Sequence, residues 1–428
     1  MRNFNVLIFP AGKENSLEIY TALKDSMNIS LFGASSKPDH GLYVFKKYKG
    51  DLPYINDDNF LTAFNKLLVD NSIDIVFPTH DTISVFLAEH KDEINAKIAA
   101  PDYETCYICR HKDKTYDVFA ENSFCPEIYR SIEHISYPAF VKPVIGEAAL
   151  GTKLIRNESD LKFIMGNEQN YVVAEFLPGD ELTVDCFTDR HNVLRFVGPR
   201  KRNRTHTGIS LNSHTVQLTD EIKEIAQVIS DKLKMRGLWF FQIRQDKNGK
   251  YKLLEISVRT AGTMGLYRNL GINLPLLTVY DLFDIDFNIS LNDFYIEVDR
   301  SLFNKFKIGY EFDNIYIDFD DTITKNGKAN EFVMLFLYKM RNAGKRINLL
   351  TRHEYDLDHT LWRLAISKEL FDNIIHTTWE FKKSAFIKET EKTIFIDNSF
   401  AERAEVKAKL NIPVFDVDAI ECLIDWKQ

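Results

Sequence analysis

The chain has 428 residues, a net charge of -8, 45% hydrophobic residues and 27% charged residues. This length exceeds what a single hydrophobic core supports, so we expect roughly two to four domains of a soluble globular protein. The negative charge balance excludes a general nucleic-acid surface, which requires a basic face. No apolar stretch approaches the ~18 residues that span a bilayer. Five cysteines are too few for a disulfide framework, so we expect a cytoplasmic protein without a membrane partner.

The first 100 residues alternate between expected strands and expected helices. Strands are expected at 6–10, 29–33 and 73–78, and helices at 14–25, 60–71 and 84–96. This alternation predicts a doubly wound α/β domain with a parallel sheet over residues 1–100. The turn after the first strand, Pro10-Ala11-Gly12, lacks the glycine spacing of a dinucleotide fingerprint, so we predict no NAD site.

Residues 101–308 change to a strand-rich pattern. Strands are expected at 172–176, 181–188, 193–198, 238–244 and 250–258, and a helix at 219–234. The last two strands are joined by Asp246-Lys247-Asn248-Gly249, a hairpin turn signal.

A second α/β alternation begins near residue 314. Strands are expected at 315–318, 347–351, 374–377 and 393–397, and helices at 331–342, 359–368 and 383–388. The connections at 324–351 and 352–382 are too short for a substantial cap domain. We therefore predict a Rossmann-like α/β domain without a large cap over residues 309–428.

Several residues of the first 300 have the chemistry of a phosphate and metal cleft. Lys142 ends an expected buried strand and supplies a positive charge for a phosphate oxygen. The glycines of Gly146–Gly151 let backbone N–H groups approach phosphates. Glu255 and Ser257 are two apart on one strand and face the same side, and Gln242 on the preceding strand is placed to oppose Glu255. Oxygen ligands of this kind suit magnesium.

These segments, with Glu175-Phe176-Leu177-Pro178-Gly179-Asp180-Glu181, resemble the ATP-grasp superfamily in matching order over about residues 1–300. The resemblance is closest to the carbamoyl-phosphate-synthase-like large-chain group, and it implies an α+β domain over residues 101–308. It also implies an enzyme that uses ATP and magnesium, with manganese as an alternative metal. Such an enzyme joins a small-molecule carboxylate to an amine or ammonia through an acyl-phosphate.

The same resemblance implies a role for each matching residue. The ATP phosphates would be contacted by Lys142, Gly151 and either Lys114 or Lys112. The adenine would be contacted by Glu175, Phe176 and Leu177, and the ribose by Glu181. The metal would be held by Gln242, Glu255 and Ser257, and the transferred phosphate would be stabilised by Arg259. The family usually has asparagine where Ser257 stands, so the second metal position departs from the family pattern.

A basic run, Arg200–Arg204, precedes Thr207-Gly208-Ile209-Ser210. Taken alone, such a run is typical of a solvated loop. The four residues after it resemble the family loop beside the substrate. We therefore interpret the run as a site for carboxylate or phosphate recognition rather than for nucleic acid.

Four motifs near the C-terminus follow the order of the haloacid-dehalogenase (HAD) superfamily: Asp318-Phe319-Asp320-Asp321-Thr322, Leu349-Leu350-Thr351, Lys382-Lys383-Ser384 and Phe395-Ile396-Asp397-Asn398. A carboxylate nucleophile divides phosphate-ester hydrolysis into two steps, and attack on an anionic phosphate needs cationic compensation. The resemblance implies a magnesium-dependent phosphatase that acts on a phosphorylated metabolite. It assigns Asp318 as nucleophile, Asp320 as general acid and then base, Thr351 and Lys383 (or Lys382) to the phosphoryl oxygens, and Asp318, Asp320 and Asp397 to the metal.

The two motif sets together predict a bifunctional enzyme, a ligase fused to a phosphatase. Two alternatives remain open. The first 300 residues would form a nucleotide-sensing module that regulates the phosphatase, which the departure at Ser257 motivates. They would otherwise form a kinase whose product the phosphatase reverses. A monomer and a homo-oligomer are both compatible with the sequence.

Overall fold

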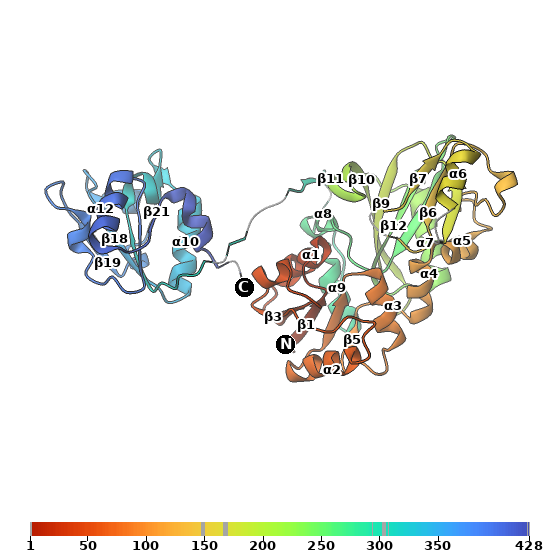
Figure 1. Cartoon of the computed structure of the whole chain (residues 1–428), viewed down its shortest axis with the longest axis horizontal. Coiled ribbons are helices and arrows are strands. Elements are labelled where there is room, and N and C mark those ends of the chain that lie inside the picture. Colours follow the sequence, from red (N-terminus) through yellow and green to blue (C-terminus); the bar gives the residue numbers. More distant parts are fainter. Residues whose placement is uncertain are drawn as a thin grey trace. The chain divides into compact units, whose positions relative to one another are not determined.

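The computed structural model describes residues 2–146, 150–165, 170–292, 294–301, 305–306, 308–425 and 427. The chain divides into a first unit, residues 1–302, and a second unit, residues 303–427 (Figure 1). In the described part of the chain, no helix has both the length and the apolar character needed to cross a membrane.

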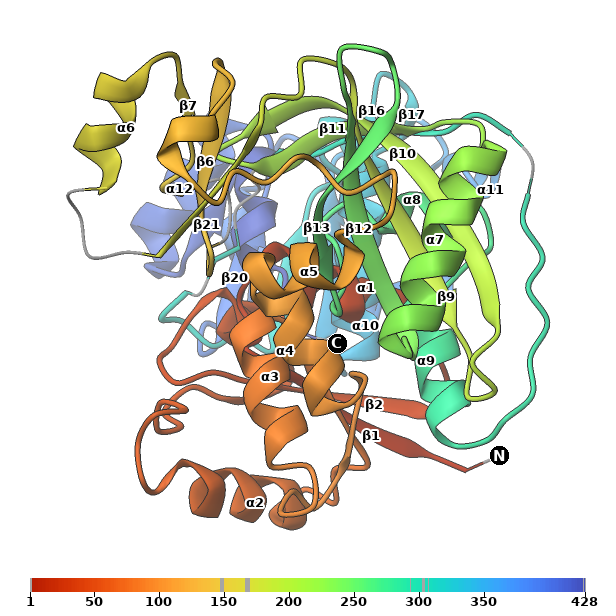
Figure 2. The same cartoon turned by 90° about the vertical axis from the view of Figure 1, so that its right-hand side faces the viewer.

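The first unit begins with a five-stranded parallel sheet. Its order is β3-β2-β1-β4-β5, formed by Lys47–Lys49, Ile29–Ala34, Phe4–Phe9, Ile75–Pro78 and Lys97–Ile98. Side chains of β1 alternate between the two faces, so Val6 packs with α1 (Glu14–Leu23) and Leu7 packs with α2 (Phe60–Asp70). Figures 1 and 2 accordingly show the sheet lying between α1 and α2.

The helix expected over 84–96 is shorter and begins earlier. It is α3, Asp81–Glu89. The ring of His80 accepts a hydrogen bond from the Thr82 backbone N–H, and an acidic residue in the first turn suits the helix dipole. The last residues of the expected range, after Glu89, form a turn that leads to β5.

A six-stranded antiparallel sheet follows in the first unit. Its order is β13-β12-β9-β10-β11-β14, formed by Tyr251–Ser257, Gly237–Gln245, Glu181–Thr188, Leu194–His206, Ile209–Thr215 and Glu297–Asp299. Its core cluster includes residues of α4, α5 and α7, which span Tyr103–Arg110, Lys112–Phe119 and Asp220–Leu233. A three-stranded antiparallel sheet, β7-β6-β8, is formed by Lys153–Ile155, Ala139–Pro143 and Tyr171–Glu175, with α6 (Glu158–Met165) packed on it.

Two further helices, α8 (Gly265–Asn269) and α9 (Leu274–Leu282), follow β13. The sequence did not predict α9. Pro275 lies in its first turn, where a proline costs no hydrogen bond, and the Asn273 side chain accepts from Leu276 N–H.

The basic run Arg200–Arg204 lies within β10 and not in a solvated loop. Arg200 is 1% exposed, and its guanidinium donates to both Asp185 carboxylate oxygens, at 2.7 and 3.1 Å. Burial raises the pKa of Asp185, and the Arg200 charge opposes that rise. Arg200 is therefore part of the core. Charged residues interrupt the apolar pattern of this strand, so its extent is hard to recognise from the sequence.

The second unit has a five-stranded parallel sheet. Its order is β19-β18-β15-β20-β21, formed by Asn373–His376, Arg346–Thr351, Asn314–Ile317, Thr393–Ile396 and Val414–Phe415. Helix α10 (Glu331–Asn342) packs on the face of Ile315, and α12 (Phe400–Leu410) packs on the face of Tyr316.

The smaller elements of the second unit differ from expectation in length. The helix expected at 359–368 is α11, Leu357–Arg363, and the one expected at 383–388 is a 3₁₀ turn, Lys383–Phe386. A short hairpin, β16 (Thr324–Lys325) and β17 (Lys328–Ala329), follows β15. Helix α12 was not predicted, although the Ser399 hydroxyl accepts from Glu402 N–H in the usual N-cap arrangement.

We expect Asp185→Asn to lower the free energy of unfolding of the first unit by about 3–5 kcal/mol, because it leaves a buried guanidinium without its counter-charge. Urea denaturation of the full-length chain, followed by tryptophan fluorescence, measures this loss. Lys66→Ala is the control, since its ion pair with Asp70 is largely exposed and should contribute little. An unchanged midpoint for Asp185→Asn would show that the buried pair is dispensable.

Candidate active sites

A cavity of about 310 Å³ in the first unit is lined by residues of both antiparallel sheets. Strands β6 and β8 contribute from the three-stranded sheet, and β9, β10, β12 and β13 contribute from the six-stranded sheet. The predicted site residues that line it are Lys142, Glu175, Phe176, Leu177, Glu181, Gln242 and Glu255. Residues that are far apart in sequence thus share one site.

Lys142 lies at the end of β6 and is 6% exposed. Its ammonium group donates to the Leu254 carbonyl at 3.1 Å and to the Tyr116 hydroxyl, and it stands 4.8 Å from the centroid of the Tyr116 ring. Burial, together with the nearby charge of Lys112, lowers the pKa of Lys142 to about 7. An anion that entered the cavity would stabilise the charged form of this lysine.

Gln242 and Glu255 are direct partners in the register of β12 and β13, as the sequence predicts. A register shift next to this pair leaves Leu254 without a direct partner on β12, and its carbonyl accepts from both Tyr116 and Lys142. Amide and carboxylate oxygens are ligands that magnesium accepts. The pair therefore has the oxygen donors that could hold a magnesium ion in this cavity.

Ser257 and Arg259 are not part of the cavity lining. The Ser257 hydroxyl donates to one Asp81 carboxylate oxygen at 2.5 Å, and Arg259 Nε donates to the other at 2.9 Å. Burial alone would raise the pKa of Asp81, but Arg259 and Ser257 bring it down to about 2. Asp81 at the start of α3 thus ties the end of β13 to the first sheet.

Of the two lysines considered for the phosphates, Lys112 lines the cavity, and its Nζ lies 3.4 Å from the Gly146 carbonyl oxygen. Lys114 is exposed and does not line it. Gly146 lines the cavity, whereas Gly151, with φ +74°, does not. Residues 147–149 of the predicted phosphate loop lie outside the described residues.

Two arginines lie beside Glu181: Arg202, which belongs to the basic run predicted to recognise a carboxylate or phosphate, and Arg244, which sequence reasoning did not single out. The Glu181 carboxylate pairs with Arg202, and it lies 3.8 Å from Arg244. Arg202 belongs to the basic run, and Thr205 of the same strand also lines the cavity. The position of Arg202 beside Glu181 could be recognised only once β10 was known to extend through the basic run.

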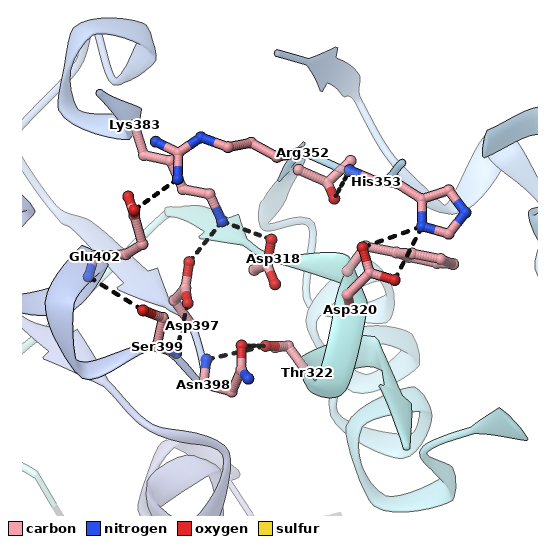
Figure 3. Close-up of polar contacts among 12 residues, drawn as sticks. Asp318, Asp320, Thr322, Arg352, His353, Lys383, Asp397, Asn398, Ser399 and Glu402 are labelled. Atoms are coloured by element: carbon pink, nitrogen blue, oxygen red, sulfur yellow. Dashed lines mark hydrogen bonds and ion pairs between the residues drawn. The ribbon is translucent and has the colours of Figure 1, made fainter. Parts of the chain in front are cut away.

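The second unit brings three predicted residues together at the carboxyl ends of its strands. Asp318 follows β15, Asp397 follows β20, and Lys383 begins the 3₁₀ turn. The Lys383 ammonium donates to Asp318 and to Asp397, at 2.6 Å each (Figure 3). Burial raises the pKa of Asp318 to about 7, with Lys383 opposing and Asp397 adding to the rise. Burial also raises the pKa of Asp397.

Asp320 points away from this cluster. Its carboxylate oxygens lie 2.9 and 3.1 Å from His353 Nδ1 (Figure 3). Thr351 is fully buried, and its hydroxyl oxygen accepts from the His353 N–H at 3.1 Å. His353 was not predicted, although its position two residues after a motif threonine at a strand end was a usable signal.

Neighbouring side chains frame the cluster. Arg352 donates to Glu402 at 2.6 Å, and the Asn398 N–H donates to the Thr322 hydroxyl at 3.0 Å. Asn398 therefore supports the turn that carries Asp320 instead of adding a second negative charge beside Asp397.

Across the described ranges, no three His, Cys, Asp or Glu side chains meet as a ready metal cluster. In the second unit Lys383 stands between Asp318 and Asp397, two of the three carboxylates that were predicted to bind metal, whereas the third, Asp320, contacts His353 instead. Burial raises the pKa of both carboxyl groups, and the single ammonium of Lys383 opposes that rise at each. The donor set therefore fits an additional cation.

Residues 167–291 match the family described as ATP-grasp in the biosynthetic pathway with Ter operon. A D-alanine–D-alanine ligase of Clostridium botulinum (strain Eklund 17B / Type B) is 32% identical over 66 residues, which are 14% of this chain and 22% of that relative. The chain thus matches about a fifth of the length of the curated relatives.

Two solved structures have a similar fold. The L-amino acid ligase from Bacillus licheniformis gives a TM-score of 0.54 with 19% identity, over 66% of this chain and 75% of that one. N5-carboxyaminoimidazole synthetase from Staphylococcus aureus, complexed with ADP, gives 0.57 with 16% identity, over 67% and 79%. These matches support the predicted ATP-grasp superfamily and its mixed α/β fold. The HAD resemblance of residues 309–428 stays a prediction.

We expect Lys383→Met to lower the free energy of unfolding of the second unit by about 3–5 kcal/mol, because two buried carboxylates lose their shared counter-charge. Thermal and urea unfolding of the full-length chain measure the change. Lys382→Met is the matched control, since Lys382 is exposed while Lys383 is buried. Equal effects of the two substitutions would contradict the geometry described here.

Proposed function

We propose that the first unit is an ATP- and magnesium-dependent carboxylate–amine ligase, and that the second unit is a phosphatase. One observation carries each half. In the first unit, Lys142 and the Gln242–Glu255 pair line a single cavity between two antiparallel sheets. In the second unit, Lys383 bridges Asp318 and Asp397 at the carboxyl ends of parallel strands.

The cavity of the first unit has the parts that a nucleotide needs. Phe176 and Leu177, which follow Glu175 at the end of β8, offer an apolar wall for the base. Among the described residues, Lys142 donates only to a carbonyl and a phenol, so a bound phosphate would give this desolvated ammonium an anionic partner. Magnesium held by Gln242 and Glu255 would supply charge neutralisation at the transferred phosphate. The ADP complex of the synthetase with a similar fold supports this interpretation.

The ligase reaction that we propose has two steps. A carboxylate oxygen of the substrate attacks the γ-phosphorus of ATP, which releases ADP and leaves an acyl-phosphate. An amine or ammonia then attacks the acyl carbon, forms the C–N bond and expels inorganic phosphate. The names of two similar proteins, a D-alanine–D-alanine ligase and an L-amino acid ligase, favour amino acids as the substrate class.

In the second unit, an Asp318 oxygen attacks the phosphorus of a phosphate monoester, and the ester oxygen leaves with a proton from Asp320. Water then hydrolyses the aspartyl-phosphate, with Asp320 as the base. Thr351 Oγ accepts from the His353 N–H, so its own hydroxyl proton is available to a phosphoryl oxygen. Magnesium beside Asp318 and Asp397 would neutralise charge on the phosphoryl group.

A second candidate function follows from Asp81. Because Asp81 binds both Ser257 and Arg259, two residues expected to act in phosphoryl transfer are engaged outside the cavity lining. A cavity that binds ATP without turning it over would make the first unit a nucleotide sensor for the phosphatase. ATP binding without ADP release, together with phosphatase rates that depend on ATP, would favour the sensor over the ligase.

The two activities should separate by mutation. Glu255→Ala should reduce carboxylate-dependent ADP release by about 10²-fold or more, because a metal ligand is lost, and should leave phosphate-ester hydrolysis intact. Asp318→Asn should reduce hydrolysis by about 10³-fold or more, because the nucleophile is lost, and should leave ADP release intact. Coupled assays of ADP and of phosphate measure both. Full ADP release in Glu255→Ala, or full hydrolysis in Asp318→Asn, would overturn the corresponding half.

Nucleotide binding should take up a proton at pH 8. There Lys142, with a pKa of about 7, is mostly neutral, and a bound triphosphate raises that pKa so that the ammonium form is restored. The uptake should fade at pH 6, where the lysine is already charged. Calorimetric titration with MgATP in two buffers of different ionisation enthalpy measures it. Lys142→Arg keeps the charge and should abolish the uptake; uptake that persists in this variant would contradict the assignment.

A further inference from the structure

Asp320 lies in a tight turn after β15, and its side chain is largely exposed to solvent. The next residue, Asp321, has φ +54°, in the left-handed region, and the Asp320 side chain is 52% exposed. An exposed carboxylate normally samples several rotamers. Both of its oxygens nevertheless lie within hydrogen-bond distance of one group, His353 Nδ1.

His353 is itself fixed by several elements of the second unit. Its ring Nε2 lies 2.9 Å from the Thr360 hydroxyl of α11, and its carbonyl oxygen lies 2.7 Å from His376 Nε2 at the end of β19. The ring packs edge-on against Phe319, with centroids 5.2 Å apart. The His353 side chain is only 7% exposed. The buried imidazole of His353, held in place by these contacts, thus lies beside the exposed carboxylate of Asp320.

This arrangement separates the supports of the two aspartates. Asp318 is held by the Lys383 ammonium, whereas Asp320 is held by His353 (Figure 3). The backbone N–H of the same histidine also binds Thr351 Oγ, so one residue orients two groups around the phosphoryl position. A general acid must lie within hydrogen-bond reach of the leaving oxygen, so its orientation limits the rate when that oxygen needs a proton.

We infer that His353 is a positioning residue that fixes the Asp320 carboxylate for protonation of the leaving oxygen. The inference rests on the proposed phosphatase function of the second unit. Its consequence depends on the ester. An alkyl phosphate expels a poor leaving group that requires the proton, whereas p-nitrophenyl phosphate expels a stable phenolate that does not.

The test compares kcat/KM on p-nitrophenyl phosphate and on a simple alkyl phosphate in the full-length chain with magnesium, because kcat/KM reports formation of the aspartyl-phosphate and not its later hydrolysis, in which Asp320 acts as base on both esters. His353→Leu should lower kcat/KM on the alkyl ester by about 10²-fold and on the nitrophenyl ester by less than about threefold. His353→Asn places an amide donor near the position of Nδ1 and should regain most of the lost rate. Asp320→Asn should show the same ester dependence, and adding His353→Leu to it should cost little more, because both act through one carboxylate.

The remaining outcomes overturn the inference. Equal losses on both esters, or no rescue by asparagine, would mean that His353 only stabilises the fold; thermal unfolding of each variant would show that loss directly. A wild-type chain that hydrolyses the nitrophenyl ester but no alkyl ester would also overturn the inference and would leave the phosphatase proposal standing. Absence of Asp318-dependent hydrolysis of any ester would overturn both.

Discussion

A desolvated lysine ammonium group lies at the centre of each candidate site. Its hydrogen-bond partners determine the balance of charge in that site. Lys142 donates to a carbonyl and a phenol, both neutral, so burial dominates and its pKa falls to about 7. Lys383 donates to two carboxylates. Burial raises the pKa of Asp318 to about 7, Asp397 adds to the rise, and Lys383 opposes it. In the proposed functions, the Lys142 ammonium gains an anionic partner, whereas the Lys383 ammonium already has two carboxylate partners. The two lysines therefore have opposite electrostatic roles in the two proposals.

The two sites use different ways of bringing distant residues together. In the second unit the strands are parallel, so the residues that follow β15, β18 and β20 meet at one edge of the sheet. In the first unit the strands are antiparallel, and the site lies over the faces of two sheets, with Gln242 and Glu255 directly paired across a hairpin. In the second unit the site residues are brought together because they follow the ends of parallel strands. In the first unit they are brought together by the register of antiparallel strands. This difference explains why short motifs mark the second site and a long series of segments marks the first.

Residues placed by a strand end or a hairpin could be predicted from the sequence. Asp318, Asp397 and the Gln242–Glu255 pair belong to this group, because an apolar strand or a turn signal fixes their position locally. Asp81 could not be assigned a partner, since its contacts with Ser257 and Arg259 cross 176 and 178 positions of the chain. The choice between Lys112 and Lys114 required the face of α5, which begins at Lys112 and carries too few apolar residues to orient it. Arg200 was predicted to recognise a carboxylate or phosphate of a ligand, but its partner is the buried carboxylate of Asp185, and this ion pair breaks the apolar pattern of β10.

Ser257 departs from the family pattern, and its contact with Asp81 gives a structural reason. A hydroxyl is short and donates one hydrogen bond, which here goes to a carboxylate on α3 at 2.5 Å. The second carboxylate oxygen takes Arg259, and these two contacts, with the guanidinium first, keep the pKa of Asp81 low in spite of its burial. The end of β13 is thereby tied to the helix that follows β4, so the strand that carries Glu255 is anchored to the parallel sheet of the same unit. In this chain, Ser257 thus serves to fix the end of β13, the strand that carries Glu255, to α3.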